Sequence, residues 1–290
     1  MTLQKPMAPI LTKTSYRLLA QLVKARTGIQ LEALNRSVVE SRLKALAVRN
    51  HLDTASLCLA AARGQEALAH QICQEILINE TYFFRDPRLF LALRDLVLPE
   101  RLSLGHGEQI RCWSAACSTG QEPLSLAMLL QEGFPNLKPD LVQILATDIG
   151  EKALAQASAG TYNHAEIERG LSPGQKQAHF SEQGVHWVAK APLRAAIRFS
   201  SLNLSAPWPD LGGLFDLVLL RNVLIYFDLD VRRQVLDRVL RRMKPGAYLL
   251  LGAGETLTGV HDGFQAAHWE NSGCYQAVIR PAYVAQERAA

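Results

Sequence analysis

The sequence predicts an α/β protein, in which a doubly wound, mostly parallel sheet follows a small all-α domain. Up to about residue 78, apolar residues recur only at helical spacing. From residue 110 onward, short apolar runs alternate with helical stretches, as they do in the β-α units of a parallel sheet. This alternation is interrupted at about 160–198, which predicts an inserted subdomain with a small antiparallel sheet.

The composition is that of a globular protein. A chain of 290 residues has room for one large domain or two smaller ones. Its 48% hydrophobic and 20% charged residues argue against a disordered chain. Neither a transmembrane run nor a secretory signal is evident, so we expect a cytoplasmic protein. The five scattered cysteines predict buried free thiols, and no metal site is expected.

Basic charge is concentrated in the helical segment. Residues 1–78 contain ten Lys and Arg against five Asp and Glu, whereas the remainder contains 21 against 22. Such a surface favours an acidic partner, which leaves nucleic acid, anionic lipid and an acidic protein open. A helix expected over 36–48 carries three of these charges beside its apolar stripe and a fourth directly after it, and either a docking face or an ordinary solvated face explains them. The four are Arg36, Arg42, Lys44 and Arg49.

A dense polar, aromatic and basic block, NETYFFRD, occupies residues 79–86. Pro87 marks a break after it, before the next helix. Asn79, Thr81 and Arg85 offer hydrogen-bond donors, and the aromatic residues offer apolar cover. The block therefore indicates either a ligand-contacting linker or a hinge with packed aromatics.

The predicted sheet has polar residues where its strands end. Strands are expected at 110–113, 141–146, 197–200, 215–220, within 244–254 and at 273–279. Ligands of such sheets bind at the carboxyl ends of the strands. The loop after the first strand is rich in small residues but lacks the GxGxxG and GxxxxGK[ST] phosphate patterns, which favours a nucleoside without phosphates.

Individual residues at these strand ends suggest roles. Glu122 begins the helix after the first strand, where an acid is also favourable with the helix dipole. Asp148 can accept hydrogen bonds from two ribose hydroxyls, although a helix N-cap is the alternative. Arg221 and Asn222 follow a buried strand directly, and Tyr226 adds a phenol nearby. A capping turn with a core aromatic is the alternative for these three.

Six segments together resemble the CheR family of chemotaxis receptor methyltransferases, in order and spacing. They are NETYFFRD, SAACSTGQEPLSLAM, ATDIGEKALAQASAGTY, FSSLNL, FDLVLLRNVLIYFD and LLLGAGETL. The resemblance extends from about residue 10 to about residue 280. It implies a helical receptor-docking domain (1–78), a linker that contributes to the active site (79–90) and a Rossmann-like methyltransferase domain (91–290) with a β-subdomain insert at about 160–198.

The resemblance also implies an activity. Family members transfer a methyl group from S-adenosylmethionine to glutamate side chains of methyl-accepting chemotaxis receptors, giving methyl esters and S-adenosylhomocysteine. In some members a C-terminal receptor peptide tethers the enzyme to the β-subdomain. Because peptides add to exposed sheet edges, we expect such an edge at 185–200.

The roles implied for single residues fall into two groups. Arg85 and Tyr226 look catalytic, with the Tyr226 phenol positioning the substrate glutamate. The residues that look like cofactor contacts are Asn79, Thr81, Arg85, Glu122, Asp148, Asn203, Leu204, Arg221 and Asn222.

Two other functions remain as alternatives. A nucleic-acid methyltransferase would suit the basic segment, but RNVL stands where base amino-group methylation usually has [ND]PP[YFW]. A non-catalytic cofactor-binding sensor would need only the cofactor residues. The complete set of linker, acidic and phenol positions favours the enzyme.

Overall fold

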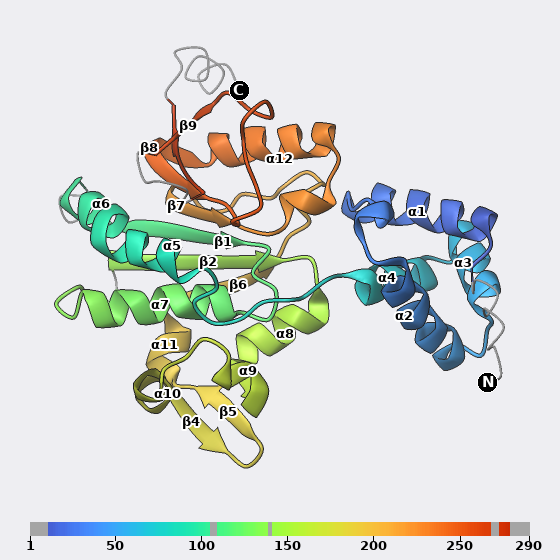
Figure 1. Cartoon of the computed structure of the whole chain (residues 1–290), viewed down its shortest axis with the longest axis horizontal. Helices are drawn as coiled ribbons and strands as arrows, with labels where there is room; N and C mark the ends of the chain where they lie inside the picture. Colours follow the sequence, from blue (N-terminus) through green and yellow to red (C-terminus); the bar gives the residue numbers. More distant parts are fainter. Residues whose placement is uncertain (1–10, 105–108, 139–140, 268–272, 279–290) are drawn as a thin grey trace, which may run out of the picture. The chain divides into compact units, whose positions relative to one another are not determined.

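The computed structural model describes residues 11–104, 109–138, 141–267 and 273–278 (Figure 1). The chain divides into two compact units. The helical unit comprises the residues up to Ile78 together with Tyr226–Asp228, and the sheet unit comprises Asn79–Ile225 and the residues from Leu229 onward. Within the described ranges, every helix is too short or too polar to cross a membrane.

The helical unit is built from capped amphipathic helices. They are α1 (Lys13–Thr27), α2 (Arg36–Arg49), α3 (Thr54–Ala62) and α4 (Glu66–Ile76), with a 3₁₀ turn at Leu31–Ala33. The side chains of Thr12, Asn35 and Asp53 cap the first three helices by accepting hydrogen bonds from backbone N–H groups. Gly28 ends α1 in the left-handed region, with φ 74°. The expected all-helical character of this segment is confirmed.

The sheet unit contains a seven-stranded sheet in the order β6-β2-β1-β7-β8-β10-β9. Its strands are β1 (Ile110–Ala115), β2 (Val142–Asp148), β6 (Ile197–Ser201), β7 (Phe215–Leu220), β8 (Met243–Leu250), β9 (Phe264–Ala266) and β10 (Cys274–Ala277). Strands β6, β2, β1, β7 and β8 are parallel, whereas β10 is antiparallel to both β8 and β9. The strand order reverses between β1 and β7, and ligands of open α/β sheets bind at such a switch point.

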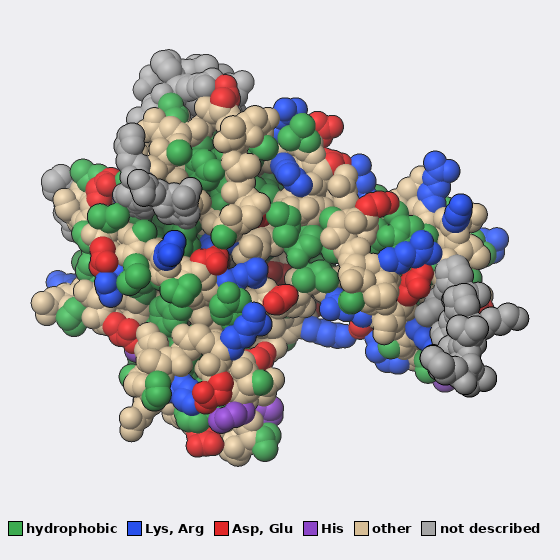
Figure 2. Space-filling view, in the orientation of Figure 1, with side chains coloured by type: hydrophobic (Ala, Val, Ile, Leu, Met, Phe, Trp, Pro, Cys, Tyr) green, Lys and Arg blue, Asp and Glu red, His purple; other side chains and the backbone are tan. Residues whose placement is uncertain are grey.

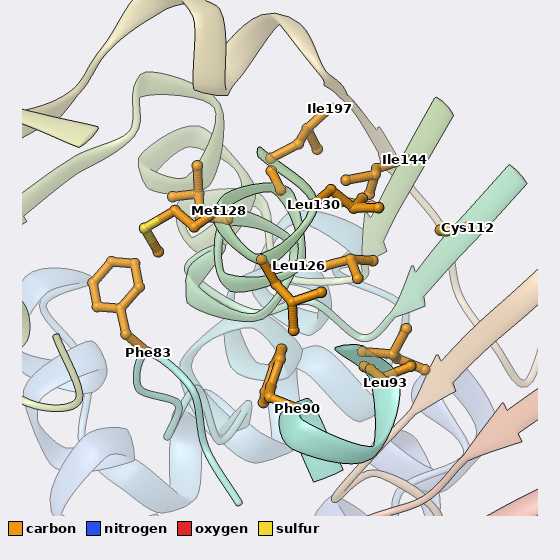
Figure 3. Packing of buried hydrophobic residues seen from close by; sticks show 14 of the residues in the cluster. Phe83, Phe90, Leu93, Cys112, Leu126, Met128, Leu130, Ile144 and Ile197 are labelled. Carbon is orange, nitrogen blue, oxygen red and sulfur yellow. The ribbon is translucent and has the colours of Figure 1, made fainter. Parts of the chain in front are cut away.

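Helices of the sheet unit cover this sheet. They are α5 (Pro87–Ala92), a π-helical turn (Leu93–Val97), α6 (Leu98–Leu104), α7 (Gln121–Gly133), α8 (Glu151–Ala159) and α12 (Leu229–Arg241), with a 3₁₀ turn at Leu224–Tyr226. Helix α7 is buried along most of its length because it packs against the sheet on one side and against α5 on another. Figure 3 shows Leu130 of α7 beside Ile144 of the sheet, Leu126 beside Phe90 of α5, and Met128 on the side of Phe83. This core fixes the start of α7, and with it the loop after β1.

The insert forms its own three-stranded antiparallel sheet in the order β3-β5-β4. Its elements are β3 (Thr161–Asn163), α9 (His164–Glu168), α10 (Pro173–His179), β4 (Phe180–Gln183), β5 (His186–Ala189) and α11 (Ala191–Ala195). The expected edge at 185–200 is wrong for this sheet, because β5 is its central strand and β3 and β4 are its edges. The alternating pattern revealed β5 but not its neighbours, since β3 has only three residues and β4 is buried only at Phe180.

The predicted fold class is confirmed: a mixed α/β unit with a doubly wound sheet and an antiparallel insert follows N-terminal helices. The expected strands at 110–113, 141–146, 197–200 and 215–220 are present, and most of them extend one or two residues further at the carboxyl end. Strands β3, β4 and β9 were not predicted.

Candidate cofactor-binding and active site

The loop after β1 lies at the switch point of the sheet and has an unusual backbone. Ala116 and Ser118 have positive φ angles of 61° and 51°, and Gly120 has φ 93°. The non-glycine residues with positive φ in the described part of the sheet unit all lie in this loop, in the linker or just after β7; they are Phe84, Asp86, Ala116, Ser118 and Asn222. Such conformations cost energy and tend to cluster at functional sites, which supports a ligand site here.

Asp148 ends β2 with its carboxylate buried beneath this loop. Its Oδ2 accepts a hydrogen bond from Ser118 N at 2.7 Å, and its Oδ1 accepts one from Gly150 N at 2.7 Å. Burial raises the pKa of Asp148 above its usual value, although the N–H groups of Gly150 and Ser118 act in the opposite direction. A carboxylate has about four lone-pair sites, so Asp148 retains capacity to accept from a ligand hydroxyl.

Ser118 connects Asp148 to the linker. While its N–H donates to Asp148, its hydroxyl donates to the carbonyl oxygen of Asn79 at 3.0 Å. One residue thus fixes both a predicted ribose acceptor and the first residue of the linker. Ser118 was not singled out from the sequence, because a serine in a small-residue loop carries no signal of its own.

Glu122 and Arg221 form a buried ion pair that links β1, α7, β7 and the linker. Glu122 Oε1 accepts a hydrogen bond from Ser114 Oγ at 2.7 Å, and Oε2 accepts one from Arg221 Nη1 at 2.8 Å. Arg221 Nη2 donates to the carbonyl of Arg85 at 2.7 Å and to the carboxylate of Asp86. The Arg221 side chain is only 2% exposed. Planar guanidinium groups suit such multiple contacts.

The linker is also held by packing and by its backbone. Phe83 is fully buried and makes edge contacts with Tyr162 and Phe180. Phe84 N donates to Ser125 Oγ of α7 at 2.9 Å. Gly170 lies so close that a Cβ there would come within 1.9 Å of the Phe83 carbonyl oxygen. Within the sheet unit the block 79–86 is therefore a fixed part of the structure.

Arg85 and Thr81, the other predicted donors of the linker, are both half-buried. The Arg85 guanidinium donates from Nη1 to the Glu80 carbonyl at 2.9 Å and lies 5.7 Å from the centre of the Tyr82 ring. That hydrogen bond uses one of the five guanidinium N–H donors of Arg85 and leaves the other four for further acceptors. Arg85 can therefore hold an anionic group while it keeps its contact with the linker.

Asn203 and Leu204 follow β6, next to the end of β2. Leu202 N donates to the Asp148 carbonyl at 2.9 Å, which places this loop beside Asp148. Asn203 Oδ1 accepts hydrogen bonds from Ser205 N at 3.0 Å and Ser205 Oγ at 2.8 Å, so the side chain also shapes its own turn. Leu204 is buried.

Asn222 follows β7 in the left-handed region, with φ 56°. Its backbone N–H donates to Glu255 Oε2 at 2.6 Å, and the N–H groups of the next three residues point to the other carboxylate oxygen. Glu255 was part of the quoted segment LLLGAGETL, but no role was predicted for it.

Tyr226 groups with the helical unit by its contacts. Its carbonyl accepts a hydrogen bond from Gln30 N at 2.7 Å, Phe227 forms a β-bridge with Ile29, and Asp228 pairs with Lys24. The Tyr226 ring packs against the core of that unit. Its predicted place beside a substrate carboxylate therefore stays a prediction.

The predicted docking residues on α2 mostly have partners inside the helical unit. Arg42 donates to the carbonyls that end α4, at 2.7 Å for Leu77. Arg49 pairs with Glu75, and Arg36 pairs with Glu40 and lies over the Tyr16 ring. Lys44 is exposed. Arg36, Lys44 and Arg49 are exposed and Arg42 is partly buried, so a docking role for this face stays a prediction.

Comparison with known proteins identifies the family. Residues 79–272 match the family model described as the CheR methyltransferase SAM-binding domain. The chain belongs to the CheR methyltransferase family. It is 38% identical to chemotaxis protein methyltransferase 1 of Pseudomonas aeruginosa, over 86% of this chain and 93% of that protein. A Vibrio parahaemolyticus chemotaxis protein methyltransferase is 37% identical, over 86% and 92%. The predicted family and cofactor, S-adenosylmethionine, are confirmed.

The geometry of this CheR-family protein fits that cofactor. A small-residue loop with a strained backbone allows close approach, Asp148 offers a buried acceptor at the end of β2, and the Glu122–Arg221 pair lies at the ends of β1 and β7. Within the ranges described, no group of three or more His, Cys, Asp and Glu side chains could hold a metal ion.

Proposed function

We propose that this chain transfers a methyl group from S-adenosylmethionine to glutamate side-chain carboxylates of methyl-accepting chemotaxis receptors. The products are glutamate methyl esters, which serve sensory adaptation, and S-adenosylhomocysteine. The relatives described above are named chemotaxis protein methyltransferases, which supports the pathway. The observation that carries the proposal is that two residues hold the block 79–86 at the strand ends. Arg221, directly after β7, binds Arg85 and Asp86, and Ser118, in the loop after β1, binds Asn79.

The cofactor residues divide by the part of the ligand they suit. Asp148 accepts from the ribose hydroxyls, Asn203 and Leu204 lie on the adenine side, and Asn79, Thr81 and Arg85 reach the transferred methyl from the linker. Glu122, Arg221 and Asn222 line the cofactor site at the ends of β1 and β7. The hydrogen bonds that join Asp148, Ser118 and Asn79 support this division, because they fix the loop and the linker together.

The cofactor supplies a methyl group on a sulfonium sulfur, which is already activated for transfer. A glutamate carboxylate is ionised at neutral pH, since its reference pKa is about 4.3, so the protein needs no general base. It must instead orient the carboxylate and exclude water. We assign orientation to Tyr226, whose hydroxyl donates to one carboxylate oxygen and thereby directs the other. Arg85 holds anionic charge without losing its proton.

The helical unit is the proposed receptor-docking domain. Ten Lys and Arg against five Asp and Glu in residues 1–78 give it a basic surface, and Figure 2 shows Lys and Arg side chains gathered on the visible face of this unit. Receptor methylation helices that carry acidic residues complement such a surface. These helices lie in the cytoplasm, where we place the protein. A receptor C-terminal peptide that adds to the insert would use β3 or β4, the edge strands.

The test is transfer of labelled methyl from S-adenosylmethionine to membranes that contain the chemoreceptors of the same cell. Label that appears on receptor protein and is released by mild base would establish a carboxyl methyl ester. Label that resists base would indicate a different acceptor atom. No label, while calorimetry shows cofactor binding, would contradict the proposed reaction.

A further inference from the structure

Glu255 lies in the loop after β8 and gathers backbone N–H groups from two segments. Its Oε2 accepts hydrogen bonds from Asn222 N at 2.6 Å and from Gly252 N at 2.8 Å. Its Oε1 accepts from Val223 N at 3.1 Å, Leu224 N at 2.8 Å and Ile225 N at 3.4 Å. One carboxylate thus satisfies four successive N–H groups after β7 and one of its own loop.

The segment after β7 needs such a partner. It passes through the left-handed region at Asn222 and then starts a short 3₁₀ turn at Leu224, and the first N–H groups of a helix have no partner within it. A carboxylate satisfies these donors, and its charge is favourable at the positive end of the turn. Without Glu255, a left-handed asparagine followed by unpaired N–H groups would have little to hold it in place.

Gly252 adds a second constraint from the same loop. A Cβ at this position would lie 2.4 Å from Asn222 Nδ2 and 2.8 Å from Asn222 Cγ. The Asn222 side chain therefore fills the space that the missing side chain leaves. Gly252 shapes the side chain of Asn222, while Glu255 fixes its backbone.

The residues on either side of this segment have predicted roles: Arg221 and Asn222 as cofactor contacts and Tyr226 as a catalytic residue. Arg221 and Asn222 precede the turn, and Tyr226 is its last residue. A shift of the backbone after β7 would move the amide side chain of Asn222, which lies beside Gly252. Groups that orient the reactants must be held in a precise geometry for methyl transfer, since small misplacements lower reaction rates strongly.

We propose that Glu255 is a positioning residue for methyl transfer, because its carboxylate fixes the backbone from Asn222 to Ile225 and thereby orients Asn222. Glu255 itself touches neither cofactor nor substrate in this proposal. The inference rests on the proposed function for its turnover prediction, but its prediction for cofactor affinity does not depend on the substrate.

The first variant is Glu255→Gln, which keeps the size but turns an NH₂ group toward N–H donors. We expect the affinity for the cofactor, measured by calorimetry, to be three- to tenfold weaker. The rate of receptor methylation, divided by the number of sites that bind cofactor, should be at least tenfold lower. Glu255→Asp keeps the charge and should recover part of both losses. Gly252→Ala leaves Glu255 intact but displaces the Asn222 side chain, so it should weaken cofactor binding even if Glu255→Gln folds poorly.

The matched control is Asp216→Asn. Asp216 is a buried carboxylate at the opposite end of β7, where it accepts from Arg101 Nη2 and Arg111 N. Its loss should lower the melting temperature but leave affinity and turnover per binding site at wild-type values.

Wild-type affinity and turnover per site in Glu255→Gln would overturn the positioning role, and if that variant folds poorly, wild-type values in Gly252→Ala would overturn it. Losses that only follow the fraction of folded protein, as in Asp216→Asn, would overturn it as well. If the wild-type chain moved no methyl to receptors, the proposed function would fail, and the affinity measurements would still decide the role of Glu255.

Discussion

At the scale of single residues, Asp148 connects burial to cofactor binding. Burial raises its pKa, so its carboxyl takes up a proton at a pH where an ordinary Asp is still ionised. A protonated carboxyl accepts a ribose hydroxyl less well. Affinity for S-adenosylmethionine should therefore fall as the pH is lowered through this raised pKa, by up to about tenfold per pH unit. Calorimetry across a series of decreasing pH measures this, and Asp148→Asn should bind weakly with a flat profile.

The sign of the stability effect separates this loss from acid unfolding. Because the pKa of Asp148 is higher in the folded than in the unfolded protein, protonation of this group favours the folded state. The contribution of Asp148 to stability thus increases as the pH falls between the two values. A melting temperature that stays level where affinity declines would support the assignment, whereas parallel declines would contradict it.

Tyr226 offers a second test at this scale. Tyr226→Phe removes one hydroxyl, and a hydrogen bond to a charged group contributes about 1.5–3 kcal/mol, which corresponds to a roughly 10- to 150-fold lower kcat for receptor methylation. Cofactor affinity should change less than about twofold. Tyr16→Phe is the control, since its hydroxyl makes one long hydrogen bond of 3.4 Å in the same unit. Equal losses of turnover and cofactor affinity in Tyr226→Phe would rule out the proposed role.

At the scale of elements, the contact between the insert and the linker depends on Gly170. It has φ 103°, and a Cβ would meet the Phe83 carbonyl at 1.9 Å. Gly170→Ala should lower the free energy of unfolding of the sheet unit by about 3 kcal/mol and weaken cofactor binding, because the block 79–86 must shift. All four tryptophans lie beyond residue 112, so denaturant unfolding followed by tryptophan fluorescence reports on this unit.

Gly184→Ala is the matched control for this substitution. Gly184 also has a positive φ, 62°, but its Cβ would have nothing within 4 Å. Gly184→Ala should lower the free energy of unfolding only by the strain of a left-handed alanine, about 1–2 kcal/mol, and should leave the cofactor affinity unchanged. If the two variants behaved alike, the close approach to Phe83 would not matter.

The elements also show how far the sequence could predict this molecule. Strand β7 was predicted at its observed bounds because its six residues, all apolar except Asp216, are followed at once by Arg221. Asp148 was singled out because it ends an apolar run, and Glu122 because it is an acid at the start of the helix that follows the first strand. Such positions depend only on local pattern and on the rule that strand ends share an edge.

What the sequence could not predict depends on contacts between distant segments. Glu255 binds N–H groups about thirty residues earlier in the chain. Ser118, which binds Asp148, also binds the carbonyl of Asn79, 39 residues before Ser118. Arg42 was expected at the surface, but it caps α4 because the end of that helix comes to lie beside it. Every residue has a backbone carbonyl and nearly every residue a backbone N–H, so the sequence does not indicate which of them a side chain will bind. These partners could be identified only from the fold.

At the scale of the whole molecule, the basic helical unit should attract acidic receptor helices over a distance. Arg42 is a poor probe of this attraction, because charge reversal would also remove the hydrogen bonds to the carbonyls that end α4. Lys44 is exposed on the same helix and is the better position. Lys44→Glu should slow receptor methylation about three- to tenfold at low salt.

That effect should disappear as salt is added, because exposed charges are largely screened beyond about 10 Å at 0.1 M ionic strength. Lys138→Glu makes the same change of charge at an exposed position of the sheet unit and should leave the rate near wild type. The measurement is the initial rate of methyl transfer to receptor membranes across a salt series. Equal slowing by both variants would mean that net charge alone governs the encounter, and a rate unchanged by Lys44→Glu at low salt would exclude α2 from the docking surface.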